Sequence, residues 1–305
     1  MNAGYLYVIL CYVLVGASYP IAKDAMNDIP IWTFTAVTFL IAALMLIPLS
    51  AVVDKTRLTR INARSWLFIS IQSLLGAVLY TAFLLYGFSY SSAITGSIVT
   101  SITPAVVLLL SAVLLKERLS LKKVFAIALG ISGVLVLTLP AAGAEGSTSM
   151  AGFVFLLLST LSSAGCVIAA NRLIVDLPAT TMAMGVCVTG FIFSLPMAIS
   201  EHTLATLPAL MEAHAGVLLY YAILVWAVPY ILFYKGVTRI PASATGMAFS
   251  VIPIAATLFS VLFFNESLGS SGAIALLLVT ASILLAESRQ QETPDNVTSE
   301  ALITD

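Results

Sequence analysis

The sequence predicts an all-α integral membrane protein with ten transmembrane helices, arranged as two inverted halves of five helices each. Three observations lead to this prediction. The 305-residue chain is 60% hydrophobic and 9% charged, with a mean hydropathy of +1.08, whereas soluble domains contain about 45–50% apolar residues. Long apolar runs recur along the chain, and the two halves share a pattern at one constant offset. With so few charges, the outer surface must face lipid rather than water.

Each predicted helix corresponds to an apolar run of about 20 residues, the length that crosses a hydrocarbon core as a helix. A membrane β-barrel is excluded, because its strands are about ten residues long and alternate in polarity. The runs extend approximately over Gly4 to Ala22, Trp32 to Val53, Trp66 to Phe88, Ala93 to Leu115, Leu121 to Pro140, Gly152 to Asn171, Thr181 to Ser200, Ala215 to Tyr234, Ser243 to Phe264 and Gly269 to Ala286.

The two ends of the chain have different characters. The first apolar run lacks the basic segment that precedes a cleaved signal core, so we expect it to remain as the first helix. Residues 288–305 are polar and aperiodic, and they are predicted to form a disordered cytoplasmic tail. The three cysteines lie inside predicted helices without paired spacing, which favours free packing thiols: Cys11, Cys166 and Cys187.

The distribution of Lys and Arg predicts the orientation, because loops retained in the cytoplasm carry these residues in excess. Ten helices place both termini on one side, and that side collects every Lys and Arg except Lys23. Both termini are therefore expected in the cytoplasm, and short loops suit a multi-pass protein of a bacterial inner membrane. The residues collected there are Lys55, Arg57, Arg60, Arg64, Lys116, Arg118, Lys122, Lys123, Arg172, Lys235, Arg239 and Arg289.

An internal duplication is visible at a single ungapped shift of 149 residues, as from Gly16 to Gly165. Since a repeat of five helices is odd, the second copy must be inverted in the membrane. We divide the chain into a first repeat, residues 1–145, and a second, residues 146–287. The matching pairs are Gly16 and Gly165, Lys23 and Arg172, Gly87 and Gly236, Ala93 and Ala242, Ser101 and Ser250, Pro104 and Pro253, Glu117 and Glu266, and Leu119 and Leu268.

The stretches "SITPAVVLLLSAVLLKERLS" (101–120) and "SVIPIAATLFSVLFFNESLG" (250–269) resemble the corresponding parts of the two EamA repeats of the drug/metabolite transporter superfamily. The resemblance extends over residues 1 to 287. It implies ten helices in a 5+5 inverted arrangement around a central cavity, and export or exchange of small metabolites, often amino acids. Many members carry Trp-Gly and Arg-Phe where this chain has Val15-Gly16 and Thr38-Phe39, so contacts by that tryptophan and arginine are not carried over.

Small residues on two equivalent helices are candidates for the transport pathway. Ser97, Ser101 and Pro104 share one helix face, and the shift makes Gly246, Ser250 and Pro253 the equivalent face. Such residues commonly serve close helix packing. The alternative is that the serines contact solute, while the prolines, with Gly16 and Gly165, act as hinges or gates for alternating access.

Aromatic residues supply a second group of candidates. Trp226 and Tyr230 are four residues apart on one face, at a depth comparable to Tyr80. These three side chains could line a cavity for a partly apolar solute or simply pack in the core. Tyr220 and Tyr234 lie near predicted helix ends and are interpreted as interfacial belt residues.

Charged residues are expected only at helix ends. Lys23 and Arg172 could extend to the interface, or could attract an anionic group at the two mouths of the pathway. Because no carboxylate or histidine is expected in the core as a proton carrier, facilitated diffusion or exchange is favoured, and a proton-coupled transporter is the alternative.

Other classes of function find less support. The twelve-residue separation of His202 and His214 is not a recognised metal-ligand spacing, and no catalytic nucleophile, nucleotide loop or cofactor motif is present. An enzyme is therefore not expected, and a receptor would leave the duplication unexplained. The lack of a broad basic surface excludes nucleic acid. The expected partners are a small-molecule substrate and the lipid bilayer; a homodimer is allowed but not required.

Overall fold

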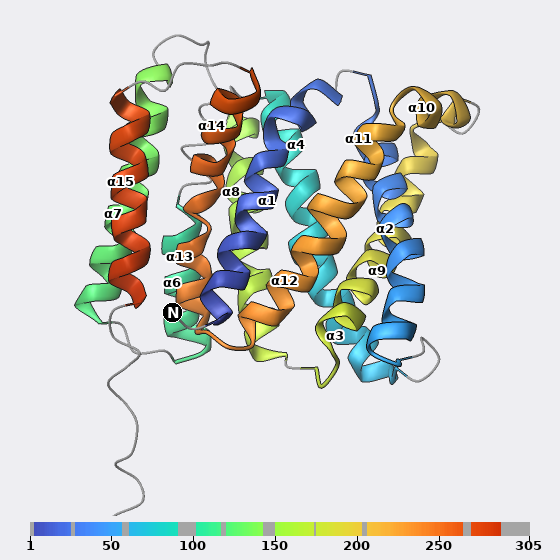
Figure 1. Cartoon of the computed structure of the whole chain (residues 1–305), viewed down its shortest axis with the longest axis horizontal. Coiled ribbons are helices and arrows are strands. Elements are labelled where there is room, and N and C mark those ends of the chain that lie inside the picture. The colour runs from blue at the N-terminus through green and yellow to red at the C-terminus, as the bar shows by residue number, and fades with distance from the viewer. Residues whose placement is uncertain are drawn as a thin grey trace, which may run out of the picture.

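The computed structural model describes residues 3–25, 28–56, 61–90, 102–116, 120–142, 150–173, 175–202, 206–264 and 270–287. Within these ranges the chain is helical and contains no strand. The helices lie roughly side by side along one direction (Figure 1). They are α1 (Ala3–Ala25), α2 (Ile31–Val53), α3 (Ala63–Ser73), η2 (Leu74–Leu79), α4 (Tyr80–Tyr90), α6 (Thr103–Leu114), α7 (Leu121–Ala142), α8 (Met150–Arg172), α9 (Ala179–Ser200), α10 (Leu207–Ala213), α11 (Ala215–Tyr220), η3 (Tyr221–Ala227), α12 (Val228–Val237), α13 (Ala242–Ala248), α14 (Val251–Phe264) and α15 (Ser270–Glu287).

Five helices in the described parts of the chain are long and apolar enough to cross a membrane: Ile31–Val53, Ala63–Gly87, Met150–Arg172, Ala179–Ser200 and Ala215–Val237. Shorter apolar helices accompany them, and large apolar side chains such as Leu44, Val113 and Leu277 are exposed on the outer surface. An outer surface of this kind requires lipid. The chain is therefore a multi-pass membrane protein, and the number of ten crossings remains a prediction.

The helices of the two predicted repeats pack against each other in matching pairs. α2 lies against α9, and α7 lies against α15 at one edge of the molecule (Figure 1). α1 packs against α12 and α14, while its counterpart α8 packs against α4 and α6. Both arrangements place close contacts at glycine, since a methyl group on Gly236 would collide with Val8, and one on Gly87 would lie 2.7 Å from Leu156. The correspondence is what an inverted duplication predicts.

The ends of α2 and α9 are capped by each other. Asp54 Oδ2 accepts hydrogen bonds from the N–H and the hydroxyl of Thr181, both at 2.8 Å. At the other end, Glu201 Oε2 accepts the N–H and hydroxyl of Thr33, both at 2.7 Å, and its Oε1 accepts the N–H of Trp32 at 3.0 Å. A carboxylate at a helix N-terminus satisfies free N–H groups and interacts favourably with the helix dipole.

Two helices contain a π-helical turn at equivalent positions. η2 follows α3, and η3 follows α11, so each interrupts one membrane-length helix near its middle. π-turns are rare and occur often at functional sites. A third interruption lies between α13 and α14, where Ser250 and Ile252 donate backbone N–H groups to residues three positions earlier. It precedes Pro253, which has no N–H to continue the helix.

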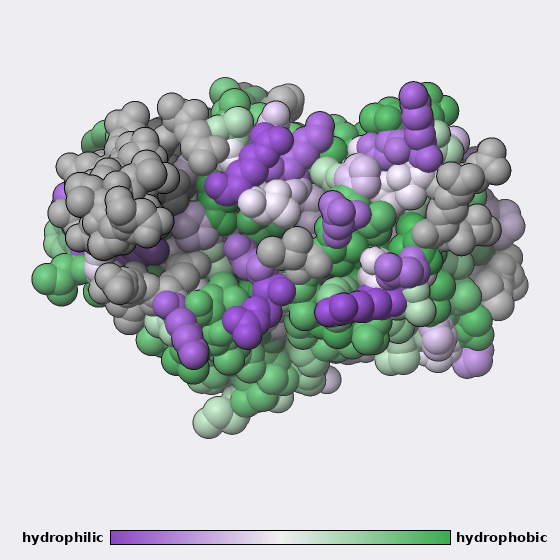
Figure 2. Space-filling model, turned by 90° about the horizontal axis from the view of Figure 1, so that it is seen from below, coloured by the Kyte–Doolittle hydropathy of each residue, from purple (hydrophilic) through white to green (hydrophobic). Residues whose placement is uncertain are grey.

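Cations of the described residues gather at the end of the bundle where the chain begins. Figure 2 views this end, which displays hydrophilic residues between apolar ones. The helix ends involved are those of α2, α6, α8 and α12 and the beginnings of α3 and α7. We call this end the cationic face; its cations are Lys55, Arg64, Lys116, Lys122, Lys123, Arg172, Lys235 and Arg239.

Candidate functional site

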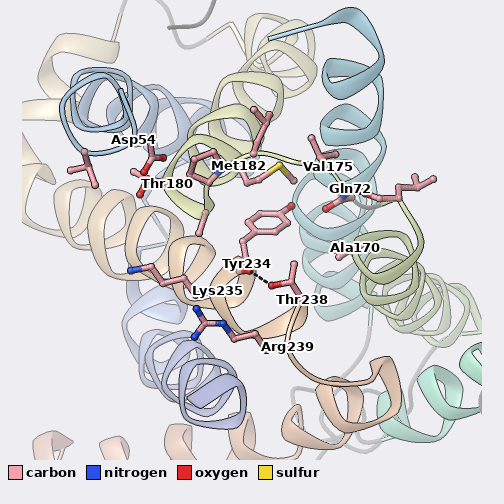
Figure 3. Close-up of a pocket in the computed structure, with 15 residues that line it drawn as sticks. Asp54, Gln72, Ala170, Val175, Thr180, Met182, Tyr234, Lys235, Thr238 and Arg239 are labelled. Atoms are coloured by element: carbon pink, nitrogen blue, oxygen red, sulfur yellow. Dashed lines mark hydrogen bonds between the residues drawn. The ribbon is translucent and has the colours of Figure 1, made fainter. Parts of the chain in front are cut away.

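A cavity of about 340 Å³ opens on the cationic face between the two predicted repeats (Figure 3). The first half contributes the end of α2 and one residue of α3, and the second half contributes parts of α8, α9 and α12 with the α8–α9 connection. Its volume falls in the range of about 300–1,000 Å³ of small-molecule sites. The lining residues include Val53, Asp54, Gln72, Ala170, Thr180, Met182, Tyr234, Lys235, Thr238 and Arg239.

The rim of this cavity carries charges of both signs. Asp54 lies on one side, and Lys235 and Arg239 lie on the other, at the end of α12. One oxygen of Asp54 is engaged by Thr181, and the guanidinium group of Arg239 lies over the ring of Tyr7, 5.4 Å from its centroid. Because carboxylate and cations share one mouth, the rim is complementary to a solute that carries both charges.

The closed end of the cavity is formed by two buried polar side chains. Gln72 is 1% exposed and Tyr234 is 5% exposed. Figure 3 shows the Tyr234 ring pointing from α12 across the cavity toward Gln72 and Met182. Gln72 Nε2 donates to the carbonyl of Leu173 at 3.3 Å, which orients the amide. The floor is thus polar, although it lies inside the bundle.

A column of stacked aromatic rings continues inward from this floor. Tyr234 stacks on Tyr230 with centroids 6.3 Å apart, and Tyr230 stacks on Trp226 at 6.0 Å. Trp226 contacts Phe39 of α2 at 4.3 Å, and its indole N–H donates to the hydroxyl of Thr38 at 3.0 Å. The column therefore connects the cavity with the contact between α2 and η3.

The π-helical turn η2 provides carbonyl acceptors beside this column. Tyr230 donates its hydroxyl to the carbonyl of Gly76 at 3.3 Å, and Ser162 donates to the carbonyl of Leu75 at 2.8 Å. A π-turn pairs its backbone groups with an i→i+5 spacing. Here the carbonyls of Leu75 and Gly76 also accept hydrogen bonds from side chains of the second half, so η2 joins the two repeats near mid-bundle.

The predicted aromatic candidates occupy two places. Trp226 and Tyr230 lie side by side, whereas Tyr80 packs with Leu84 and Leu156 in a separate cluster toward α8. None of the three lines the cavity in Figure 3. Their contact with solute remains a prediction that concerns a path deeper than this cavity.

The predicted small residues and prolines lie elsewhere in the bundle. Ser250 is buried near α7, since a methyl group on Gly130 would lie 2.9 Å from its hydroxyl oxygen. Pro104 is the second residue of α6, where a missing N–H costs no hydrogen bond. Ser97 and Ser101 lie outside the described residues, and so do the side chains of Pro253 and Lys23.

The remaining candidates are the two glycines and Arg172. A methyl group on Gly16 would collide with the carbonyl of Ile252, whereas one on Gly165 would lie 3.6 Å from Leu75, an ordinary contact. Arg172 is exposed on the cationic face, and its Nη1 approaches the carbonyl of Leu114 at 3.5 Å. Gly16 is therefore tightly packed and Gly165 is not; their roles as gates, and that of Arg172 at a pathway mouth, stay predictions.

Three residues of the site were missed by sequence reasoning. The prediction that Tyr234 is an interfacial belt residue is wrong, because its side chain is buried at the cavity floor. Gln72 was not singled out, although an amide in an apolar helix is a signal of function. Asp54 follows α2 directly, and its cap on α9 depends on a contact between segments 127 residues apart.

Metal-binding chemistry has no support in the described parts of the chain. No group of three His, Cys, Asp or Glu side chains there could hold a metal ion. Cys11, Cys166 and Cys187 are buried free thiols, as predicted.

Comparisons with known proteins agree with this architecture. The model of the EamA-like transporter family matches residues 2–139 and again residues 150–287. The uncharacterized transporter YetK of Bacillus subtilis (strain 168) is 27% identical over 293 residues, which cover 95% of this chain and 88% of YetK. The uncharacterized transporter YvbV of the same organism is 24% identical, with 92% and 90% covered. A crystal structure of a protein 19% identical in sequence matches 96% of this chain and 100% of its own, with a TM-score of 0.77.

Proposed function

Because this chain belongs to the EamA-like transporter family, we propose that it is a secondary transporter of small metabolites, amino acids or related zwitterions, that works by alternating access. In this proposal ten helices cross a bacterial inner membrane as two inverted halves of five. Both termini lie in the cytoplasm, since the cationic face corresponds to the side that retains Lys and Arg. Transport proceeds by facilitated diffusion or exchange.

The observation that carries the proposal is the cavity itself. It opens at the cationic face, lies between the halves, and ends at Gln72 and Tyr234 inside the bundle. A solute can therefore enter from one side but meets buried side chains before the other. This is the geometry of an inward-open state in a transporter whose halves exchange conformations.

The zwitterionic solute class is supported by the charges at the rim. Lys235 is exposed and suited to a solute carboxylate, while Asp54 lies across the mouth. Charges of both signs at one mouth offer an oppositely charged group to each end of a zwitterionic solute. A phosphate-specific site would instead be expected to present several buried arginine or lysine residues.

The proposal is tested by counterflow of labelled amino acids into proteoliposomes that contain the purified protein. We expect uptake of a subset of the panel, unchanged when a proton gradient is imposed. Lys235→Gln should reduce uptake of the transported amino acids severalfold, because it removes a rim cation. The matched control is Lys122→Gln, which neutralises a cation of the same face that does not line the cavity.

Three outcomes decide the proposal. Uptake that depends on Lys235 but not on Lys122 supports it. Uptake driven by a proton gradient would replace exchange with the proton-coupled alternative. Absence of uptake for every amino acid, with the protein folded and inserted, would refute the amino-acid assignment.

A further inference from the structure

Two polar atoms at the closed end of the cavity have no hydrogen-bond partner among the described residues. They are the amide oxygen Oε1 of Gln72 and the hydroxyl oxygen of Tyr234. Both belong to residues more than nine-tenths buried that line the cavity. More than 90% of buried polar groups in proteins are paired, and an unpaired one costs about 1–3 kcal/mol. Two such atoms at one cavity floor therefore require an explanation.

Both side chains are held in place by other contacts. The amide nitrogen of Gln72 must face the carbonyl of Leu173, which can only accept, so the amide oxygen is directed elsewhere. The ring of Tyr234 is held between Tyr230, stacked at 6.3 Å, and Phe233, at 5.3 Å in an edge-on contact. The two atoms are thus preorganised rather than free to find partners in the protein.

The chemistry of the pair restricts what can bind it. Gln72 Oε1 can only accept a hydrogen bond, and the Tyr234 hydroxyl can donate one. A carboxylate cannot donate to Gln72, and an ammonium group cannot accept from Tyr234. The cavity's carboxylate, on Asp54, lies at the rim and is already engaged by Thr181, so a cation at the floor would meet only neutral acceptors.

We propose that Gln72 and Tyr234 form a recognition pair for a carboxamide group of the transported solute, which they meet as it passes from the cavity toward the aromatic column. The carboxamide N–H binds Gln72, and the carboxamide carbonyl accepts from Tyr234. The inference rests on the proposed function, because the charged ends of the solute then lie at the rim. It narrows the solute class to amino acids with a carboxamide side chain.

The test is equilibrium binding to the purified protein in detergent, with three probes of similar size: glutamine, glutamate and methionine. Glutamine should bind at least about fivefold more tightly than either analogue, the contribution of one to two hydrogen bonds. Tyr234→Phe should remove most of this preference. It should not lower the thermal unfolding temperature, because the lost hydroxyl has no hydrogen-bond partner among the described residues. Tyr220→Phe, on the same membrane-length helix outside the cavity, is the matched control.

The possible results distinguish a failure of the recognition pair from a failure of the proposed transport function. Equal affinity for glutamine and methionine, no binding of any probe, or no effect of Tyr234→Phe on the preference would overturn the pair. A lower unfolding temperature for Tyr234→Phe would mean that the hydroxyl is structural, which also overturns it. Counterflow of other amino acids without a glutamine preference would refute the pair alone. Tight glutamine binding without any counterflow would refute transport and leave the pair standing.

Discussion

Asp54 and Glu201 are 147 positions apart, and each closes the N-terminus of the helix that comes from the other half. Each is the residue directly after its own helix, and each is followed by a residue in the left-handed conformation, Lys55 at a φ of 54° and His202 at 55°. Lone carboxylates at loop ends usually contribute little. These two are different, because each accepts both a backbone N–H and a hydroxyl, and the pair fastens α2 to α9 at both ends.

Removing the Glu201 cap should destabilise the protein. Glu201→Ala leaves two N–H groups and one hydroxyl without their acceptor, so we expect a loss of about 1–2 kcal/mol in the free energy of unfolding. Thermal unfolding in detergent measures this as a lower midpoint. Glu212→Ala, which removes an exposed carboxylate of α10, is the control; equal effects of the two variants would contradict the capping role.

The two glycines at repeat-equivalent positions should respond oppositely to alanine. Gly16→Ala places a methyl group against the Ile252 carbonyl and should destabilise the α1–α14 contact by about 1–3 kcal/mol. Gly165→Ala has room and should be neutral or stabilising by up to about 1 kcal/mol through helix propensity. Unfolding midpoints of the two variants compare these effects directly. A stable Gly16→Ala variant would show that α1 and α14 can separate without cost.

At the scale of the element, the interruptions of regular helix are more informative than the helices. η2 and η3 occupy equivalent places in two membrane-length helices, and the break between α13 and α14 precedes Pro253. The α2–α9 pair, in contrast, is continuous despite Pro48 and Pro196 within it. Since helix interruptions are places where regular backbone hydrogen bonds are lost, we expect the capped α2–α9 pair to be more rigid than the interrupted helices.

Repairing one interruption should slow transport without preventing binding. Pro253→Ala supplies an N–H that can bond the Phe249 carbonyl in the α-helical spacing, in place of the present bond from the Ile252 N–H at 3.0 Å, and so continue α13 into α14. We expect the counterflow rate to fall severalfold, while the affinity for the transported solute changes by less than about twofold. Pro48→Ala, inside the uninterrupted α2, is the matched control. An unchanged rate for Pro253→Ala would exclude the break as a moving part.

Element-level features could be predicted from sequence to very different extents. The positions of the helices could be predicted from apolar runs, because the length and the composition needed to cross a bilayer are local properties of the sequence. The π-turns could not be predicted, because the extra residue in a turn depends on tertiary packing. The residue types in "LLGAVL" and "YAILVWA" carry no signal for it. Trp226 and Tyr230 could be paired from their four-residue spacing. Tyr234 and Gln72 could not, because they line the same cavity only through the packing of helices from different halves.

On the scale of the whole molecule, the duplication explains features that no single helix does. The α1 contacts with α12 and α14 are repeated by α8 with α4 and α6, and the carboxylate caps are exchanged between halves. The halves are nevertheless not equivalent in packing, as Gly16 and Gly165 demonstrate. The cavity between the halves opens at the cationic face, and the proposed alternating access requires a second state that opens at the other end.

The orientation of this opening leads to a prediction about accessibility. Thr238→Cys puts a thiol on the cavity lining, which also includes the beginning of α9. His202→Cys puts a thiol just beyond the other end of α9. A membrane-impermeant maleimide should label the first only in inverted membrane vesicles and the second only in intact spheroplasts. Cys11, Cys166 and Cys187 are buried and should remain unlabelled, so no other substitution is needed. Labelling of both positions from the same side would contradict a membrane-spanning α9 between them. Labelling in the reversed order would place the cationic face outside, and the excess of Lys and Arg would then fail as a guide to this protein's topology.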